Sequence, residues 1–237
     1  MRDASKRRMW IAGWCVLLLV FGGCTVIARR VEPPAPGSPL RAQLEELLTR
    51  VTEVPKRPHP GGYERSCQSG KSCVFGPAWT DDTDAPGGHD GCDTRNNVLA
   101  AQLTAVEFRP GTHNCVVLAG KLADPYSGEN AQFAKASAGD VQIDHVYPLA
   151  AAWDMGASTW PLDRRMRFAN DVQYNLLAVS GAINQAKGDR TPADWLPPAG
   201  AYHCFYAGKY LTVAVQYQLP ITSDDRRVLT RIAKGCS

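Results

Sequence analysis

The segment 141–150, VQIDHVYPLA, places an aspartate and a histidine side by side in an otherwise apolar run. Burying a charge is costly unless it has a partner or a metal, so Asp144 and His145 require an explanation. Asp144 offers hard carboxylate oxygens, which suit Mg²⁺ or Mn²⁺, and His145 can take a proton from water near neutral pH. Neighbouring residues of a strand point to opposite faces, so the two can serve one site only where the strand ends or twists. Pro148 favours such an end.

Three further polar residues follow at a spacing that could complete a site. Asn175 precedes the apolar run LLAVS, and Asn184 and Lys187 lie in SGAINQAKGD, which predicts a helix capped by Ser180. Residues three apart on a helix share a face, so the Asn184 amide and the Lys187 ammonium are expected to project together. The start of the helix also presents unpaired N–H groups to an anion. A metal, a base and a cation in one place predict phosphodiester hydrolysis.

The same residues carry a resemblance to a known family. DHV-P, then N-L, then N-x-x-K-G-D resembles the HNH, or ββα-metal, nuclease motif, in the subgroup with Asp for the first His and Asn for the last. Longer strings resemble the secreted HNH-family proteins common in actinobacteria, over roughly residues 60–237: GCDTRNNVL, LADPYSG, IDHVYPLAAAWDMGA, FANDVQYNLLAVSGAINQAKGD and WLPP.

The resemblance implies a role for each residue of the motif. His145 would be the general base, and Asp144 and Asn184 would bind a divalent metal, Mg²⁺ or Mn²⁺. Asn175 would belong to the catalytic set by bracing the loop and orienting the histidine, and Lys187 would contact phosphate.

Two features of the longer strings concern residues outside the motif. Arg95, in CDTRN, is expected to make either a phosphate contact or a buried salt bridge. CQSGKSC departs from the family pattern, since it is inserted between Tyr63-x-Arg65 and Phe75-Gly76. This insertion is expected to change only the local shape.

The N-terminus predicts export. A basic start, MRDASKRRM, precedes the apolar stretch WIAGWCVLLLVFGG, and FGGC resembles a lipoprotein cleavage box that would make Cys24 a lipidation site. The uncharged run 9–28 is also long enough to span a bilayer, and free secretion is a third alternative. All three place the remainder of the chain outside the cytoplasmic membrane.

The cysteines agree with export. An even number beyond the N-terminal segment predicts disulfides, and no C-x-x-C pair stands with histidines at metal-ligand spacing. Proximity along the chain favours the pairs Cys67–Cys73, Cys92–Cys115 and Cys204–Cys236.

The chain is long enough to bury one substantial core, and we expect one disulfide-braced α+β domain with a ββα-metal nuclease core. A signal peptide or anchor is expected at 1–24, a proline-rich tether at 25–37, and an amphipathic helix with a linker at 38–61. The helix is expected to begin with Ser38 as its cap and to pack on the main domain or dimerise. The nuclease domain would occupy 62–237, with its core motif at 141–190.

Within this domain, apolar runs and turn residues predict several elements. CVVLAGKLADPYSG reads as a strand entering a turn at 124–128, and VQIDHVY and NLLAVSG read as strands. TVAVQYQLPIT fits a strand or a helix. The acidic stretch TDDTDAPGGHDG does not match a calcium-loop pattern and is expected to be a solvated loop.

Charge gives no independent support for nucleic acid as the partner. The formal net charge of +3 comes from the first residues, and the remainder is balanced, so binding must rest on a local patch. The sequence predicts an extracytoplasmic, metal-dependent endonuclease that acts on nucleic acid, with DNA favoured over RNA. Little sequence specificity is expected because no sequence-reading module is present. A non-catalytic cell-surface binding protein is the alternative. We expect a monomer without an obligate protein partner.

Overall fold

The computed structural model describes residues 33–237. The expected export segment, Cys24 and most of the tether lie outside these residues, and so does the choice among lipid anchor, membrane span and free secretion. Within the described part of the chain, none of the helices is both long and apolar enough to cross a bilayer.

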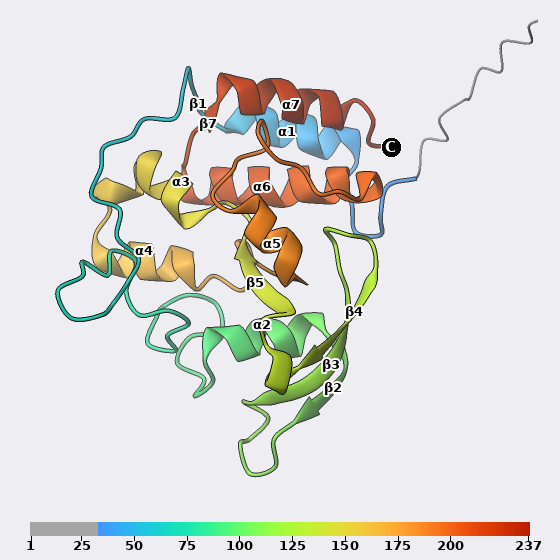
Figure 1. Ribbon diagram of the computed structural model, residues 1–237. Coiled ribbons are helices and arrows are strands. Elements are labelled where there is room, and N and C mark those ends of the chain that lie inside the picture. Colours follow the sequence, from blue (N-terminus) through green and yellow to red (C-terminus); the bar gives the residue numbers. More distant parts are fainter. Residues whose placement is uncertain (1–32) are drawn as a thin grey trace, which may run out of the picture. The chain divides into compact units, whose positions relative to one another are not determined.

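Three helices pack against one another on one side of the domain (Figure 1). They are α1 (Arg41–Arg50), α6 (His203–Tyr217) and α7 (Ser223–Ala233). α1 buries Leu44 and Leu48, which share one face of the helix because they are four residues apart. The amphipathic N-terminal helix therefore packs on the rest of the described domain.

A short parallel strand pair joins the ends of this helical layer. β1 (Glu53–Val54) follows α1 and pairs with β7 (Ile221–Thr222), which precedes α7. The Arg226 guanidinium reaches from α7 to the carbonyl oxygens of Leu48 and Val51, at 2.8 and 3.0 Å. These bonds satisfy carbonyls at the end of α1, which have no partner within the helix.

α1 begins later than the sequence predicts. Ser38 is not its cap: the hydroxyl is buried without a hydrogen-bond partner in residues 33–237, and the helix starts at Arg41. The Gln43 side chain instead accepts the Leu40 amide at 2.8 Å. This bond satisfies an N–H at the helix start from within the first turn, so no serine cap is needed.

The segment TVAVQYQLPIT, which fits a strand or a helix, is divided between the two. Its first half continues α6 to Tyr217, and its last residues form β7. Gln218 takes a left-handed conformation with φ of 56°, and Pro220 follows, which cannot continue a helix.

An antiparallel sheet and one helix form the other side of the domain. β2 (Thr104–Phe108), β3 (Val117–Ala123) and β4 (Asn130–Ala134) pair in the order β2-β3-β4, and α2 (Thr94–Gln102) packs on β3. β3 enters the predicted turn, which the Gly128 amide closes on the Asp124 carbonyl at 2.8 Å.

Between the two sides lies a two-stranded ribbon followed by a helix. β5 (Val141–His145) pairs antiparallel with β6 (Leu176–Ser180), and α5 (Gly181–Lys187) follows β6 directly and packs on both strands. The two predicted strands and the predicted helix are confirmed, but the Ser180 side chain at the start of α5 makes no capping hydrogen bond. The connection from β5 to β6 contains α3 (Leu149–Asp154) and α4 (Leu162–Ala169).

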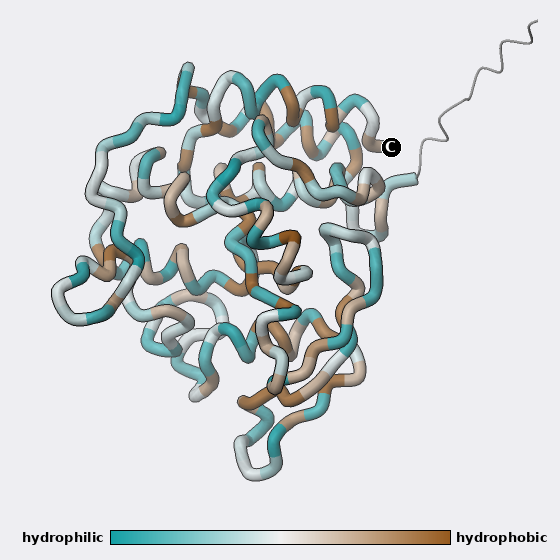
Figure 2. The backbone as a smooth tube through the Cα atoms, viewed as in Figure 1, coloured by the Kyte–Doolittle hydropathy of each residue, from teal (hydrophilic) through white to brown (hydrophobic). Residues whose placement is uncertain are grey.

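The ribbon separates two hydrophobic cores. Leu177 and Val179 of β6 belong to the core with the helices, whereas Leu176 and Ala178 belong to the core with α2 and the sheet. Figure 2 shows hydrophobic positions gathered in the strands and along one side of the helices, with hydrophilic loops around them. Residues directly opposite in an antiparallel pair share a face.

The β5–β6 register therefore directs the side chains of Asp144 and His145 to opposite faces of the ribbon. Asp144 lies opposite Leu177 and points toward the helical core, whereas His145 lies opposite Leu176 and points the other way. Both can border one cavity because β5 ends at His145.

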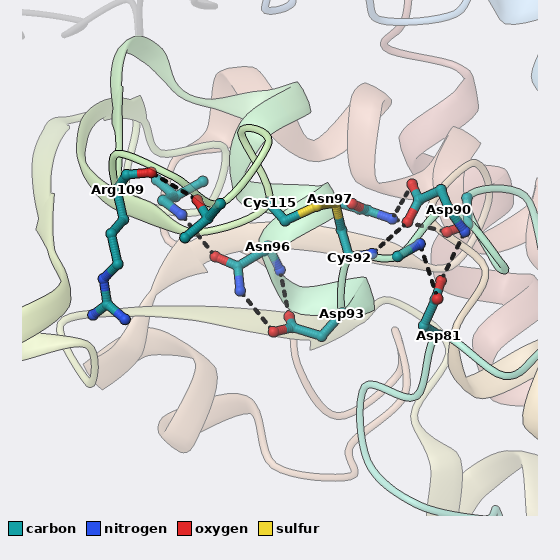
Figure 3. Close-up of a disulfide and its surroundings, with 12 residues drawn as sticks. Asp81, Asp90, Cys92, Asp93, Asn96, Asn97, Arg109 and Cys115 are labelled. Carbon is teal, nitrogen blue, oxygen red and sulfur yellow. Dashed lines mark hydrogen bonds between the residues drawn. A yellow bond between two sulfur atoms is a disulfide. The ribbon is translucent and has the colours of Figure 1, made fainter.

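Residues 33–237 contain three disulfides, and the predicted pairs Cys67–Cys73, Cys92–Cys115 and Cys204–Cys236 are confirmed. Cys92–Cys115 ties the segment before α2 to the segment before β3 (Figure 3). Beside it, Asn96 of α2 accepts the Val117 amide at 2.9 Å. The domain is thus a mixed α and β fold with three covalent cross-links.

The acidic loop before α2 is organised by its own carboxylates. Asp81 accepts the amides of Asp90 and Gly91, each at 3.0 Å, and Asp90 accepts the Cys92 amide at 2.8 Å (Figure 3). Among residues 33–237 there is no cluster of three His, Cys, Asp or Glu residues suited to a metal ion. The carboxylates act as turn caps.

The disulfides are expected to differ in their contribution to stability because they close loops of different length. Cys204–Cys236 spans a separation of 32 residues and Cys67–Cys73 a separation of 6. Replacing Cys204 and Cys236 by serine should lower the free energy of unfolding by about 3–4 kcal/mol, and replacing Cys67 and Cys73 by about 2 kcal/mol. Urea unfolding of both double variants measures the difference. Equal losses would contradict the chain-entropy explanation.

Candidate functional site

Asp144 lies in a buried charge network. Its side chain is 5% exposed and forms an ion pair with Lys187, whose side chain is fully buried. The Lys187 ammonium donates to both Asp144 oxygens, at 2.9 and 2.8 Å, and to the His145 carbonyl at 2.8 Å. Three acceptors match the three protons of an ammonium. Burial raises the pKa of Asp144 and lowers that of Lys187, and the attraction between them opposes both shifts.

Tyr126, in the turn between β3 and β4, completes this network. Its hydroxyl donates to Oδ2 of Asp144 at 2.5 Å. Burial raises the pKa of Tyr126 well above its ordinary value, so the hydroxyl keeps its proton and remains a donor. Trp195 packs edge-on against the Tyr126 ring, with the ring centroids 5.0 Å apart. The sequence interpretation missed Tyr126, although LADPYSG is one of the strings that resemble the family.

The structure corrects the role expected for Lys187. A phosphate cannot reach an ammonium that is fully buried and whose three protons already have acceptors. Nor do Asn184 and Lys187 project together, since Asn184 borders a cleft while Lys187 lies beneath it against β5. The sequence pattern predicted a cation near Asp144, but it did not predict that Asp144 itself would be the ion-pair partner of this cation.

His145 is held as a neutral imidazole. Its Nε2 lies 2.8 Å from the Ala169 carbonyl oxygen, which can only accept, so Nε2 carries the proton and Nδ1 keeps its lone pair. The ring stacks on Trp79, with centroids 5.6 Å apart. Burial, and secondly the nearby Arg65 guanidinium, lower the pKa of His145 to about 3. The neutral ring leaves Nδ1 without a hydrogen-bond partner in residues 33–237, as proton uptake requires, but a pKa of about 3 makes it a weak base at neutral pH.

Asn175 braces the chain just beyond β5. The side-chain oxygen accepts the Tyr147 amide at 2.9 Å, and its carbonyl oxygen accepts the Val146 amide, also at 2.9 Å. The amide nitrogen donates to the Tyr147 carbonyl at 3.3 Å. Asn175 is fully buried and so acts through the backbone that follows His145.

The side chain of Asn184 is oriented by a chain of two hydrogen bonds. Gln142 donates its amide nitrogen to the Gly139 carbonyl at 3.3 Å, and its oxygen accepts the Asn184 Nδ2 at 3.0 Å. Because a carbonyl can only accept, this chain assigns the direction of both amides. The Asn184 oxygen is left without a hydrogen bond from the described residues.

The Arg95 side chain is bonded to backbone carbonyl oxygens and not to a carboxylate. Its guanidinium donates to the carbonyl oxygens of Ala138 and Val141, both at 2.9 Å, and so ties α2 to the start of β5. The salt-bridge alternative is wrong, because within residues 33–237 its partners are backbone carbonyls. Burial lowers the pKa of Arg95. A phosphate contact stays a prediction.

One cleft brings most of the predicted residues together. It has a volume of about 540 Å³, and Asp144, His145 and Asn184 all border it. Arg65 and Asp189 border it as well, and neither had a predicted role. Asn175 and Lys187 lie behind the cleft and support it, whereas Arg95 lies at the other end of β5.

The donors at the cleft fit a hard divalent cation. Oδ2 of Asp144 accepts from both Lys187 and Tyr126, but Oδ1 accepts from Lys187 alone and retains one acceptor position. The free amide oxygen of Asn184 is a second hard donor. Two oxygen donors of this kind suit Mg²⁺ or Mn²⁺ better than Zn²⁺.

The buried ion pair should be essential to stability. Lys187→Met leaves the Asp144 carboxylate buried without its counter-charge, and we expect a loss of about 3–5 kcal/mol in the free energy of unfolding. The double variant with Asp144→Asn should lose less than the two single losses combined, because neither charge is then stranded. Urea unfolding tests this, with the exposed Lys121→Met as control. Strict additivity would contradict the pairing.

The lowered pKa of His145 sets a pH dependence. Between about 3 and the ordinary value of 6.5, the unfolded chain binds the proton and the folded chain does not. The free energy of unfolding should therefore fall as the pH falls below about 6.5. The test measures the free energy of unfolding of the wild-type protein and of His145→Gln over this pH range, both in the presence of a chelator. Identical pH profiles for the two proteins would refute burial of a neutral His145.

Comparisons with known proteins identify relatives of the whole domain. Residues 93–232 match the family model described as GmrSD restriction endonucleases, C-terminal domain. A protein of the fungus Arthroderma benhamiae, described as an uncharacterized secreted protein, is 34% identical over 221 residues, which cover 92% of this chain and 98% of the relative. No solved structure matches the chain. The comparisons support a nuclease-related family, and the likeness to actinobacterial HNH proteins stays a prediction. The chain belongs to the family of the GmrSD restriction endonuclease C-terminal domain.

Proposed function

We propose that the protein is an exported, metal-dependent endonuclease that hydrolyses phosphodiester bonds in nucleic acid. The observation that carries the proposal is the cleft where β5 ends. It gathers a neutral His145 and two hard-oxygen donors, Oδ1 of Asp144, which accepts from Lys187 alone among the described residues, and the amide oxygen of Asn184. Membership of a nuclease-related family supports a nuclease-type function. The three disulfides and the secreted fungal relative support export.

In this mechanism His145 takes a proton from water through Nδ1, while its Nε2–H bond to Ala169 keeps the ring in place. The water oxygen attacks phosphorus, and the bond to the leaving oxygen breaks. Asp144 and Asn184 would hold the cation, which supplies positive charge to stabilise the developing negative charge. Asn175 fixes the backbone beyond His145 so that the base keeps its position.

DNA is the expected substrate, cleaved with little sequence preference. Among residues 33–237, no element resembles a helix or ribbon module that reads base edges. Recognition then rests on the phosphate backbone, which carries no sequence information.

A non-catalytic binding protein is the second candidate, and one observation favours it. Asp144 already has a counter-charge in Lys187, so the fold does not need a metal to neutralise the carboxylate. Cleavage assays decide between the two. Under the second candidate, DNA would remain intact with every divalent metal.

The test compares loss of the base with loss of a metal ligand. Asp144 is unsuitable because its removal strands Lys187, so we choose Asn184→Ala, which removes a side chain bonded only to Gln142. His145→Ala should reduce the cleavage rate by about 10²–10⁴-fold, and excess metal should not restore it. Asn184→Ala should recover part of its activity as Mg²⁺ or Mn²⁺ is raised. Chelation should abolish cleavage by the unmodified protein.

The assay uses plasmid DNA at fixed ionic strength, with near-wild-type unfolding curves required of both variants. Cleavage that survives chelation would rule out the metal mechanism. Recovery of His145→Ala with metal would make the histidine a ligand and not the base.

A further inference from the structure

Arg65 borders the candidate cleft together with the proposed catalytic residues. It lies in the segment between α1 and α2, far in sequence from β5 and α5, and shares the cleft with Asp144, His145 and Asn184. A second, smaller cavity is bordered by Arg65, His145 and Trp79. Arg65 and His145 therefore border both cavities.

Arg65 is the charged residue of the cleft without an ion-pair partner among residues 33–237. Three charged residues of this part of the chain border the cleft: Arg65, Asp144 and Asp189. Asp144 is paired with Lys187, and Asp189 is paired at 2.9 Å with Arg57, which it shares with Asp154. Arg65 makes no ion pair and no side-chain hydrogen bond with any residue of 33–237, and its side chain is exposed. The cleft thus presents one unsatisfied guanidinium, which attracts an anion.

The backbone on both sides of Arg65 is tied down. The Cys73 amide donates to the Ser66 carbonyl at 3.1 Å, and the Val74 amide donates to the Glu64 carbonyl at 3.0 Å. The Cys67–Cys73 disulfide closes the loop that these bonds begin. A fixed backbone reduces the entropy lost when the side chain engages a ligand.

This loop is also anchored on the core. Phe75 packs against Trp153 and Phe168, with ring centroids 6.3 and 6.1 Å apart. Phe75, just beyond the CQSGKSC loop, thus ties this segment to the hydrophobic core and also borders the smaller cavity.

We propose that Arg65 binds a backbone phosphate of the nucleic acid beside His145, an inference that rests on the nuclease function proposed above. A guanidinium can donate two parallel hydrogen bonds to phosphate oxygens, which fixes the orientation of the phosphate as well as its position. Under this proposal Arg65 takes the role that the sequence assigned to Lys187, and it does so from a segment other than α5.

The experiment measures binding separately from cleavage. The full chain carrying His145→Ala is titrated with a fluorescent DNA duplex in chelator, at a series of salt concentrations. Adding Arg65→Gln should weaken binding about tenfold or more at low salt, and should reduce the slope of log K against log salt by about 0.9, the amount for one lost phosphate contact. Arg65→Lys should restore most of the slope but less of the affinity, because an ammonium lacks the paired geometry.

Arg109→Gln is the matched control, since it removes the same charge from an exposed position in the β2–β3 hairpin. If Arg65→Gln and Arg109→Gln have equal effects on affinity and slope, the inference is overturned and Arg65 contributes only net charge. Cleavage by the unmodified protein is scored independently. Failure to cleave with any divalent metal would refute the proposed function, whereas a site-specific loss in Arg65→Gln would still support the phosphate contact.

Discussion

The ion pair between Lys187 and Asp144 is the interaction on which the site depends. It joins the last residue of α5 to β5, with the Lys187 side chain fully buried and that of Asp144 only 5% exposed. Because each partner alone would be an uncompensated buried charge, α5 and β5 cannot separate without a large free-energy cost. The same ammonium binds the His145 carbonyl, so one buried proton donor fixes the carboxylate, the helix and the backbone of the candidate base.

This pairing also relieves an electrostatic conflict. A nuclease that holds a cation with carboxylates presents negative charge to a polyanionic substrate. Lys187 pairs with Asp144 from within the core, and Arg57 pairs with both Asp189 and Asp154. Among the charged residues that border the cleft, Arg65 alone has no ion-pair partner in residues 33–237. Under the proposed function, a substrate phosphate would meet this guanidinium.

Both hydrophobic packing and disulfide cross-links stabilise the structure around the site. The β5–β6 ribbon is held from both sides by hydrophobic cores, which fix its register and hence the directions of Asp144 and His145. The loops around these cores carry further cross-links and caps. Disulfides close two of them, at Cys67–Cys73 and Cys92–Cys115, and carboxylate caps such as Asp81 organise a third.

The sequence alone determined the local elements of the site. The apolar runs around Asp144 and Asn175 predicted β5 and β6, and the SGAINQAKGD pattern predicted α5, because periodicity and turn residues report local backbone preference. Short sequence separation also led to the correct disulfide pairs.

Tertiary structure decided which side chains meet. Tyr126 and Arg65 reach the site from distant segments, and no local pattern encodes such contacts. Lys187 shows the same limit of local sequence patterns. Helical spacing placed it near Asn184, but whether its ammonium faces solvent or a buried carboxylate depends on packing against β5. Partner choice for a charged side chain is set by burial, and burial is a property of the assembled fold.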